Sequence, residues 1–246
     1  MNTNHWIFIS PHLDDVVLSC GGLVWDLTQQ GHRVEIWTLM AGFPVGEDFS
    51  PLAQENHQAW GMSGAAAIRV RREEDCAACA ILGAEARHCD WMDAIYRQDP
   101  YTNEPIVHND QELFSFLPEP ALVEEITRFL DQAIPEGSQL VLPVGLGGHI
   151  DHQAVVQAGE RIARVNNFYA DYPYILDEFE NIMLWNSQLS NITQRLNQDA
   201  LNAWEAAVLC YTSQLSGFWR DENETRLALR NYLAGGGGRL WKRSRR

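Results

Sequence analysis

Two apolar stretches joined by a helical pattern constrain the fold of this chain more than any other feature. Residues 6–9 form a run of apolar and β-branched side chains that is typical of a buried strand. Residues 15–30 place leucines at helical spacing and end at Gly31, and residues 33–39 alternate as a second strand. A strand, a crossover helix and a second strand imply two parallel neighbours in one sheet. The opening of the chain therefore predicts an α/β fold.

The rest of the chain continues this alternation. The pattern leads to a strand over residues 140–144 and a helix over 151–165, followed by helical patterns over 193–215 and 222–233. A polar stretch with several prolines, residues 93–120, is expected to be a long surface excursion. We therefore expect a mostly parallel sheet flanked by helices, with an irregular helical extension at the C-terminal end.

No internal repeat and no change in composition divides the chain, and its 246 residues suit one large domain. We expect this single domain to cover residues 1–234. Residues 235–246 consist of four glycines followed by a basic segment. Because chain ends of this composition are usually frayed and solvated, they are expected to form a flexible tail.

The composition argues against several kinds of partner and site. The formal net charge is −15, so nucleic acid and anionic membranes are not expected as main partners. No apolar run reaches the length of a membrane span, and the first five residues lack the basic start of a signal peptide. Five scattered cysteines indicate no disulfide framework, and the Cys76/Cys79 pair fits helix packing better than redox chemistry. We therefore expect a cytoplasmic protein.

Side chains suited to acid–base and metal chemistry follow two of the predicted strands. His12, Asp14 and Asp15 come after the first strand, and His149 and His152 come after the strand over 140–144. Open α/β sheets bind ligands at the carboxyl ends of their strands, so both clusters belong at one crevice. Two imidazoles and a carboxylate suit a zinc-like ion, and a remaining carboxylate is free to activate water.

The spacing within each cluster points to the same site. His12 and Asp15 are three residues apart, as are His149 and His152, which places each pair on one face of a first helical turn. Asp14 points in a different direction from its neighbour Asp15 and so has a different task. Taken singly, each aspartate also fits a helix N-cap and each histidine a structural role. The presence of both clusters together favours the metal site.

Together these motifs resemble the LmbE/PIG-L family of zinc-dependent deacetylases. The resemblance rests on four segments: Pro11-His12-Leu13-Asp14-Asp15-Val16, Gly21-Gly22, Arg71-Arg72-Glu73-Glu74 and His149-Ile150-Asp151-His152. It covers residues 5–165 well and continues more weakly through residues 169–174 and 211–214. Leu13, Val16 and Ile150 depart from the usual family residues, but none of them is an expected ligand.

The resemblance implies a Rossmann-like fold that needs no dinucleotide, and it implies a bound Zn²⁺ with Fe²⁺ as the alternative. Three residues are expected to hold the metal and leave one position open for water: His12, Asp15 and His152. Asp14 is the implied general base towards that water, whose attack on an amide carbonyl releases an acetyl or other acyl group. His149 is expected to stabilise the oxyanion or protonate the leaving amine, with Asp151 orienting it and holding it charged. Arg71 is the implied substrate-binding residue.

The implied substrate is a small N-acetylated amino sugar of the N-acetylglucosamine type, and members of this family are often homo-oligomers. Two alternatives stay open: a metal-dependent hydrolase of another amide, such as a thiol-conjugate amide, and an inactive, metal-stabilised glycan-binding module. An unligated Asp14 argues against the inactive module, which has no use for it. Gly147 stands where some members carry a tyrosine that polarises the carbonyl, so the oxyanion role falls more heavily on His149.

Overall fold

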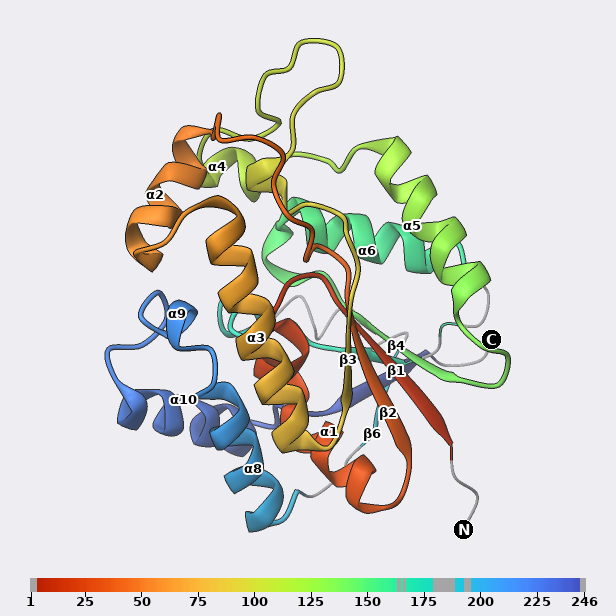
Figure 1. The fold of residues 1–246 in the computed structure, drawn as a ribbon. Helices are drawn as coiled ribbons and strands as arrows, with labels where there is room; N and C mark the ends of the chain where they lie inside the picture. The colour runs from red at the N-terminus through yellow and green to blue at the C-terminus, as the bar shows by residue number, and fades with distance from the viewer. Residues whose placement is uncertain (1–3, 163–164, 166, 179–188, 193–195, 244–246) are drawn as a thin grey trace.

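The computed structural model describes residues 4–162, 165, 167–178, 189–192 and 196–243 (Figure 1). Within these residues the centre of the fold is a seven-stranded sheet with the strand order β3-β2-β1-β4-β5-β7-β6. The strands are β1 His5–Ser10, β2 Arg33–Thr38, β3 Glu85–His88, β4 Gln139–Pro143, β5 Asn167–Tyr169, β6 Leu189–Ile192 and β7 Leu240–Arg243. The five strands from β3 to β5 run parallel, and β7 runs antiparallel to both β5 and β6. The predicted mostly parallel α/β sheet is confirmed.

The opening strand–helix–strand unit forms the middle of this sheet. β1 pairs in parallel with β2 along its whole length and with β4 on its other side. Ile7, Phe8 and Ile9 of β1 are completely buried, as expected for a parallel strand covered on both faces. The crossover between β1 and β2 is α1, Asp15–Gln29, so His12, Asp14 and Asp15 lie at the junction of β1 and α1.

Helices cover both faces of the sheet (Figure 1). On one face α1, α3, α8 and α10 pack together, and on the other α5 packs against α6. The helical elements after α1 are α2 Pro51–Trp60, α3 Gly64–Leu82, η1 Ala94–Tyr96, α4 Asp110–Leu113, α5 Pro120–Ala133, η2 Leu146–Gly148, α6 Ile150–Glu160, η3 Tyr174–Leu176, α8 Gln198–Val208, α9 Thr212–Leu215 and α10 Glu222–Ala234, where η marks a 3-10 turn. The last three helices form the expected C-terminal helical extension.

Two adjacent glycines allow α1 to approach α8 closely. A Cβ added to Gly21 would lie 2.7 Å from the Cδ1 atom of Trp204, and Gly22 faces the same indole ring. The Trp204 indole N–H donates a 2.6 Å hydrogen bond to the carbonyl of Val17 within α1, which is kinked at Cys20. The Gly-Gly pair of the sequence therefore serves the contact between two helices.

The excursion over residues 93–120 contains more structure than its polar sequence predicts. It includes η1 and α4, and its apolar side chains join a second, smaller core with α2, α3 and α6. The members of this core include Leu52, Ile68, Ile95, Tyr96, Val107, Leu113 and Ile150. Only the loop near the Gln98↔Pro105 bridge projects away from the molecule, at the top of Figure 1. The excursion is thus anchored beside the start of α6.

The C-terminal segment corrects the expectation of a flexible tail. Leu240–Arg243 form β7, which pairs with β5 through Phe168↔Trp241 and so belongs to the sheet. Leu240 is buried, and Gly238 adopts the left-handed φ of 69° that lets the chain turn into the strand. In the sequence, the basic residues of this segment hide the signal of the apolar pair Leu240-Trp241, which anchors the segment to the sheet.

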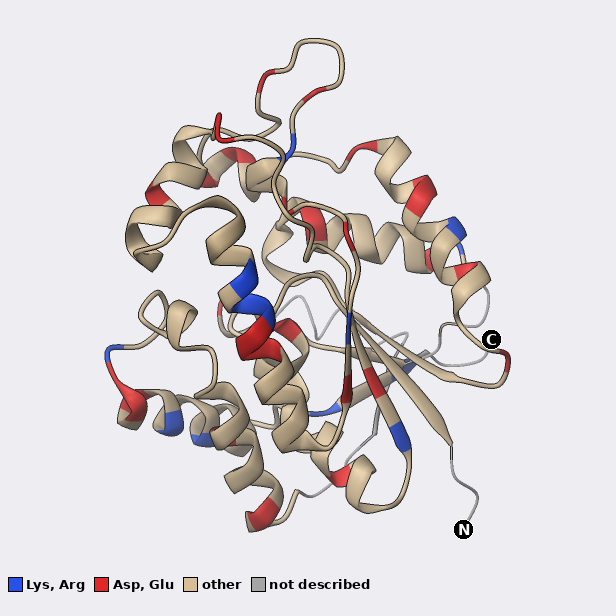
Figure 2. Ribbon diagram, in the orientation of Figure 1, with Lys and Arg blue, Asp and Glu red and all other residues tan. Residues whose placement is uncertain are grey.

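Acidic positions are spread over both helical layers and the excursion, with fewer basic ones among them (Figure 2). This distribution accords with the net charge of −15. Among the helices that the structure describes, none is long and apolar enough to cross a membrane.

Candidate active site

Three histidines meet at the carboxyl edge of the sheet. His12 follows β1, while His149 and His152 lie at the beginning of α6, which follows β4. The ring centroid of His12 lies 4.7 Å from that of His149 and 5.3 Å from that of His152. Because β1 and β4 are parallel neighbours, their ends bring these distant parts of the sequence together.

The Asp15 carboxylate lies between two of these imidazoles. Its Oδ2 atom accepts a 2.7 Å hydrogen bond from the backbone N–H of His12, which fixes its direction. The same oxygen lies 3.5 Å from His12 Nδ1 and 3.4 Å from His152 Nε2. Burial opposes ionisation of Asp15, but the neighbouring imidazoles of His152 and His12 hold its pKa well below its ordinary value.

The environment of His152 is that of a metal ligand. Its Nδ1 lies 2.7 Å from Asp171 Oδ1, and the other oxygen of Asp171 accepts the backbone N–H groups of Gly145 and Leu146. Its Nε2 is buried and has no hydrogen-bond partner among the described residues. A carboxylate that fixes one nitrogen and leaves the other facing a second carboxylate is the usual setting of a metal-binding histidine. His12, His149 and His152 also bring donor nitrogens within 4.8 Å of one another. These imidazole nitrogens and the Asp15 carboxylate between them are donors that fit a zinc-type ion.

Asp14 is the buried carboxylate that does not face the two imidazoles. Its Oδ2 lies 3.9 Å from Nη2 of Arg71 on α3. Burial, followed by the negative charge of Asp15, raises the pKa of Asp14 to about 7. The two adjacent aspartates therefore face different partners: Asp14 faces Arg71, and Asp15 faces the imidazoles.

The contacts of Asp151 differ from those expected. Its backbone N–H donates to His149 Nδ1 over 3.1 Å, whereas its carboxylate makes no hydrogen bond to that ring among the described residues. Instead Asp151 Oδ2 lies 3.0 Å from His12 Nε2 and accepts the backbone N–H of Ala94. Burial, followed by the nearby His12, lowers the pKa of His149 well below its ordinary value. Because Nδ1 of His149 accepts the backbone N–H of Asp151, that nitrogen carries no proton, and the Asp151 carboxylate contacts His12 instead.

Arg71 lies at the edge of the same site. Its guanidinium stacks over the ring of Trp60 at 5.1 Å and is buried. Its Nε atom has no hydrogen-bond partner among the described residues. A buried cation with an unused N–H group beside the Asp14 carboxylate suits the binding of a polar group.

Several residues near the site were not found by sequence reasoning. Phe114 lies 5.3 Å from the His149 ring and Tyr174 lies 5.6 Å from His152, so both form walls of the site. Asp171 orients His152. Its position two residues after β5 could have indicated a place at the carboxyl edge of the sheet. Asp93, by contrast, opens the excursion and is therefore a candidate pocket residue from the sequence, and it lies 3.8 Å from His12 Nε2. Arg97 contacts Asp151. Arg97 carries no sequence signal, because only the folded excursion brings it here.

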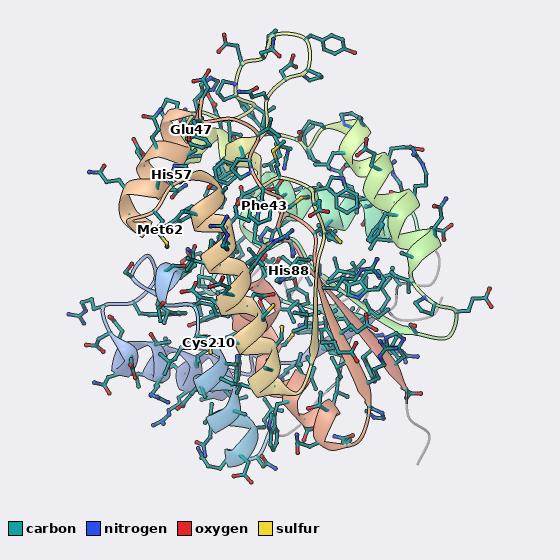
Figure 3. All side chains as sticks on the ribbon, viewed as in Figure 1. Phe43, Glu47, His57, Met62, His88 and Cys210 are labelled. Atoms are coloured by element: carbon teal, nitrogen blue, oxygen red, sulfur yellow. The ribbon has the colours of Figure 1, made fainter. Side chains whose placement is uncertain are left out.

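Other histidines have structural partners. His57 on α2 lies 2.8 Å from the Tyr96 hydroxyl, and His88 at the end of β3 lies 2.7 Å from Asp75 (Figure 3). Both belong to elements that surround the site rather than to the cluster of three histidines. Burial raises the pKa of the Cys79 thiol, which accords with a packing role for that cysteine.

Comparison with protein families identifies the family of this chain. It matches the PIG-L family, described as GlcNAc-PI de-N-acetylase, over residues 7–163, which is more than half of its length. The chain belongs to the PIG-L family. The matched region contains the three histidines, both aspartates of the β1–α1 junction and Arg71.

Individual relatives carry related names. The 2'-N-acetylparomamine deacetylase of Niallia circulans is 27% identical over 247 residues, covering 90% of this chain and 85% of the relative. Among solved structures, the zinc-inhibited form of the teicoplanin deacetylase Orf2 has a TM-score of 0.78 at 28% identity, covering 98% of this chain and 99% of its own. The A40926 pseudoaglycone deacetylase Dbv21 has a TM-score of 0.69 at 27% identity, and the match covers 99% of this chain and 97% of that chain. Each of these relatives is named a deacetylase.

Proposed function

We propose that this protein is a metal-dependent N-deacetylase that removes an acetyl group from the amine of a small N-acetylated amino sugar. One observation carries the proposal: the buried His152 Nε2 has no hydrogen-bond partner among the described residues and faces the Asp15 carboxylate. The deacetylases of acetylparomamine, teicoplanin and A40926 pseudoaglycone among its relatives support the reaction and the class of substrate.

The proposed metal ligands are His12, Asp15 and His152, through the Nδ1, Oδ2 and Nε2 atoms that face one another. Two imidazoles and one carboxylate suit Zn²⁺, with Fe²⁺ as the alternative. Such an ion supplies Lewis acidity towards an amide carbonyl and lowers the pKa of a water molecule. Three protein ligands are typical of a catalytic rather than a structural zinc site.

Asp14 is the proposed general base. It is adjacent to the proposed ligand Asp15 but points away from the imidazoles, and its one ion-pair contact among the described residues is the long 3.9 Å approach to Arg71. Its carboxylate is therefore available to take a proton from the attacking water and to pass it to the leaving nitrogen. The deacetylation releases acetate and a free amine.

His149 and Arg71 are proposed to bind the substrate during this reaction. Because His149 Nδ1 accepts the N–H of Asp151, the ring proton resides on Nε2, which can donate to the developing negative charge on the carbonyl oxygen. The proposal therefore uses a neutral His149, where the resemblance implies a charged ring. The free Nε–H of Arg71 is suited to a hydroxyl or carbonyl oxygen of the sugar.

The test is the release of free amine from a panel of N-acetyl amino sugars, including an N-acetylglucosaminide and an N-acetylated aminoglycoside. Because the relative Orf2 was solved in a zinc-inhibited form, Zn²⁺ and Fe²⁺ are each loaded at one equivalent per chain. We expect Asp14→Asn to lower amine release by roughly 10²–10⁴-fold with the metal still bound. Glu55→Gln, which changes an exposed carboxylate on α2, is the matched control and should match the wild type.

Each other outcome contradicts a defined part of the proposal. Full activity in Asp14→Asn refutes the assignment of the base. Metal binding with release only from a thiol-conjugate amide assigns a different substrate to the same site. Sugar binding without any release favours the glycan-binding module, and failure to bind either metal removes the proposed centre.

A further inference from the structure

The side chain of Arg97 ties the excursion to the start of α6. Arg97 is 8% exposed and follows η1, and its guanidinium contacts three separate parts of the chain. Its Nη1 donates to the carbonyl of Met92 over 2.9 Å. Its Nε and Nη2 form a two-pronged contact with Glu119 of 2.8 and 3.1 Å. Its Nη1 also lies 2.6 Å from Oδ1 of Asp151. One side chain thus joins both ends of the excursion to α6.

The carboxylate of Asp151 connects Arg97 to the proposed metal site. It is completely buried, and its two oxygens have different partners. Oδ1 faces Arg97, whereas Oδ2 accepts the backbone N–H of Ala94 over 2.9 Å and lies 3.0 Å from His12 Nε2. A carboxylate acceptor at Nε2 assigns the ring proton of His12 to that nitrogen, so Nδ1 keeps its lone pair towards Asp15.

We propose that Arg97 is a positioning residue that holds Asp151 against His12, and so sets the orientation in which His12 offers Nδ1 to the metal. This inference rests on the proposed metal site. Arg97 touches neither the metal ligands nor the substrate-binding Arg71, and it acts only through Asp151. Because the same guanidinium holds Met92 and Glu119, the anchoring of the excursion and the orientation of a metal ligand depend on one side chain.

The geometry requires an arginine rather than any cation. Four hydrogen-bonding or ionic contacts leave the guanidinium of Arg97 in fixed directions, towards Glu119 on one side and towards Asp151 and Met92 on the other. A lysine ammonium is a single point charge and cannot span both carboxylates with this fork. A neutral side chain would leave the buried carboxylate of Asp151 without its cation.

The experiment measures the dissociation constant of Zn²⁺ by competition with a chromogenic chelator, so that it does not depend on catalysis. We expect Arg97→Met to weaken zinc binding about 10–100-fold, as is usual when the partner of a metal-binding histidine is disturbed. Arg97→Lys should recover part of this loss, because it restores the charge but not the fork. The matched control is Arg72→Met, since Arg72 also donates to loop carbonyls, of Ala41 and Cys89, but does not contact Asp151. It should bind zinc like the wild type.

A double-mutant cycle with Asp151→Asn separates positioning from general destabilisation. If Arg97 acts through Asp151, Arg97→Met should change the zinc dissociation constant by less than threefold in the Asp151→Asn background. Equal losses in both backgrounds, or unchanged binding in Arg97→Met, would overturn the proposal. The far-ultraviolet circular dichroism of every metal-free variant shows whether it folds. Arg97→Lys provides a second, more conservative variant if Arg97→Met does not fold. Absence of zinc binding in the wild type would instead refute the proposed metal site.

Discussion

Asp14, the proposed general base, has a backbone conformation that favours glycine. Its φ is 140°, in the region that residues with a Cβ rarely adopt, and it directly precedes α1. Strain of this kind is usually retained where a side chain must point in a required direction. At Asp14 the strained turn directs the carboxyl towards Arg71 while the next residue, Asp15, faces the imidazoles.

This strain can be measured by comparing Asp14→Gly with Asp14→Ala. Both variants lack the carboxylate and should lose deacetylase activity to the same extent. Because glycine accepts the positive φ and alanine does not, we expect the glycine variant to be more stable by about 1 kcal/mol. Urea unfolding of the metal-free proteins gives the difference. An alanine variant as stable as the glycine variant would show that the turn carries no strain.

At the residue scale, sequence reasoning reached the groups that follow strands and missed those brought in by tertiary contacts. His12, Asp14 and His152 stand beside strands whose apolar runs are evident, so their place at the sheet edge follows from chain order. Asp171 follows β5, which is only three residues long and gives a weak pattern. Arg97 depends on how the excursion folds, which no periodicity in that polar segment reveals.

The contact between α1 and α8 depends on the absence of a side chain at Gly21. Alanine is a better helix former than glycine by about 1 kcal/mol, so propensity alone predicts that Gly21→Ala stabilises α1. The added Cβ, however, would lie 2.7 Å from Cδ1 of the completely buried Trp204. We therefore expect a net loss of about 1–3 kcal/mol, measured by urea unfolding. The loss should shrink in a Trp204→Phe background, and a loss of equal size there would argue against this contact.

The contact between α8 and α10 has an ionic component centred on Glu205. This carboxylate is buried, and it accepts hydrogen bonds from Arg230 at 2.7 and 3.2 Å and from Arg226 at 3.1 Å. Burial opposes its ionisation, but the hydrogen bonds from Arg230 and Arg226 outweigh burial and lower its pKa. A carboxylate whose pKa is lowered by folding stabilises the folded state where it is ionised.

We expect Glu205→Gln to lower the free energy of unfolding by about 1 kcal/mol at neutral pH, a modest value because both arginines are partly exposed. The difference from the wild type should be complete above the unfolded-state pKa of about 4.3 and should disappear as the pH falls through the lower folded-state pKa. Urea unfolding at a series of pH values tests this. A difference that does not depend on pH would mean that the lost stability is not ionic.

At the scale of the whole molecule, the order of strands explains why the site lies where it does. The parallel strands β1, β4 and β5 are consecutive in the sheet, and their carboxyl ends carry His12, the α6 histidines and Asp171, respectively. The opening βαβ unit made the parallel sheet predictable, and with it the meeting of the two His/Asp clusters. The antiparallel edge was not predictable in this way, because β7 is a four-residue strand within a basic segment that resembles a solvated terminus.

The place of β7 in the sheet makes the C-terminal segment a structural part of the molecule. A chain that ends after Gly238 lacks the buried Leu240 and exposes the edge of β5, the strand that leads to Asp171. Burial of one leucine contributes about 2–3 kcal/mol, which lowers the unfolding temperature of a chain of this size by roughly 5–10 °C. We expect this loss in thermal unfolding of the truncated protein, and little change when the chain ends after Arg243. If both truncated chains unfold at the temperature of the full chain, β7 contributes nothing to stability and the segment behaves as the flexible tail that its composition suggests.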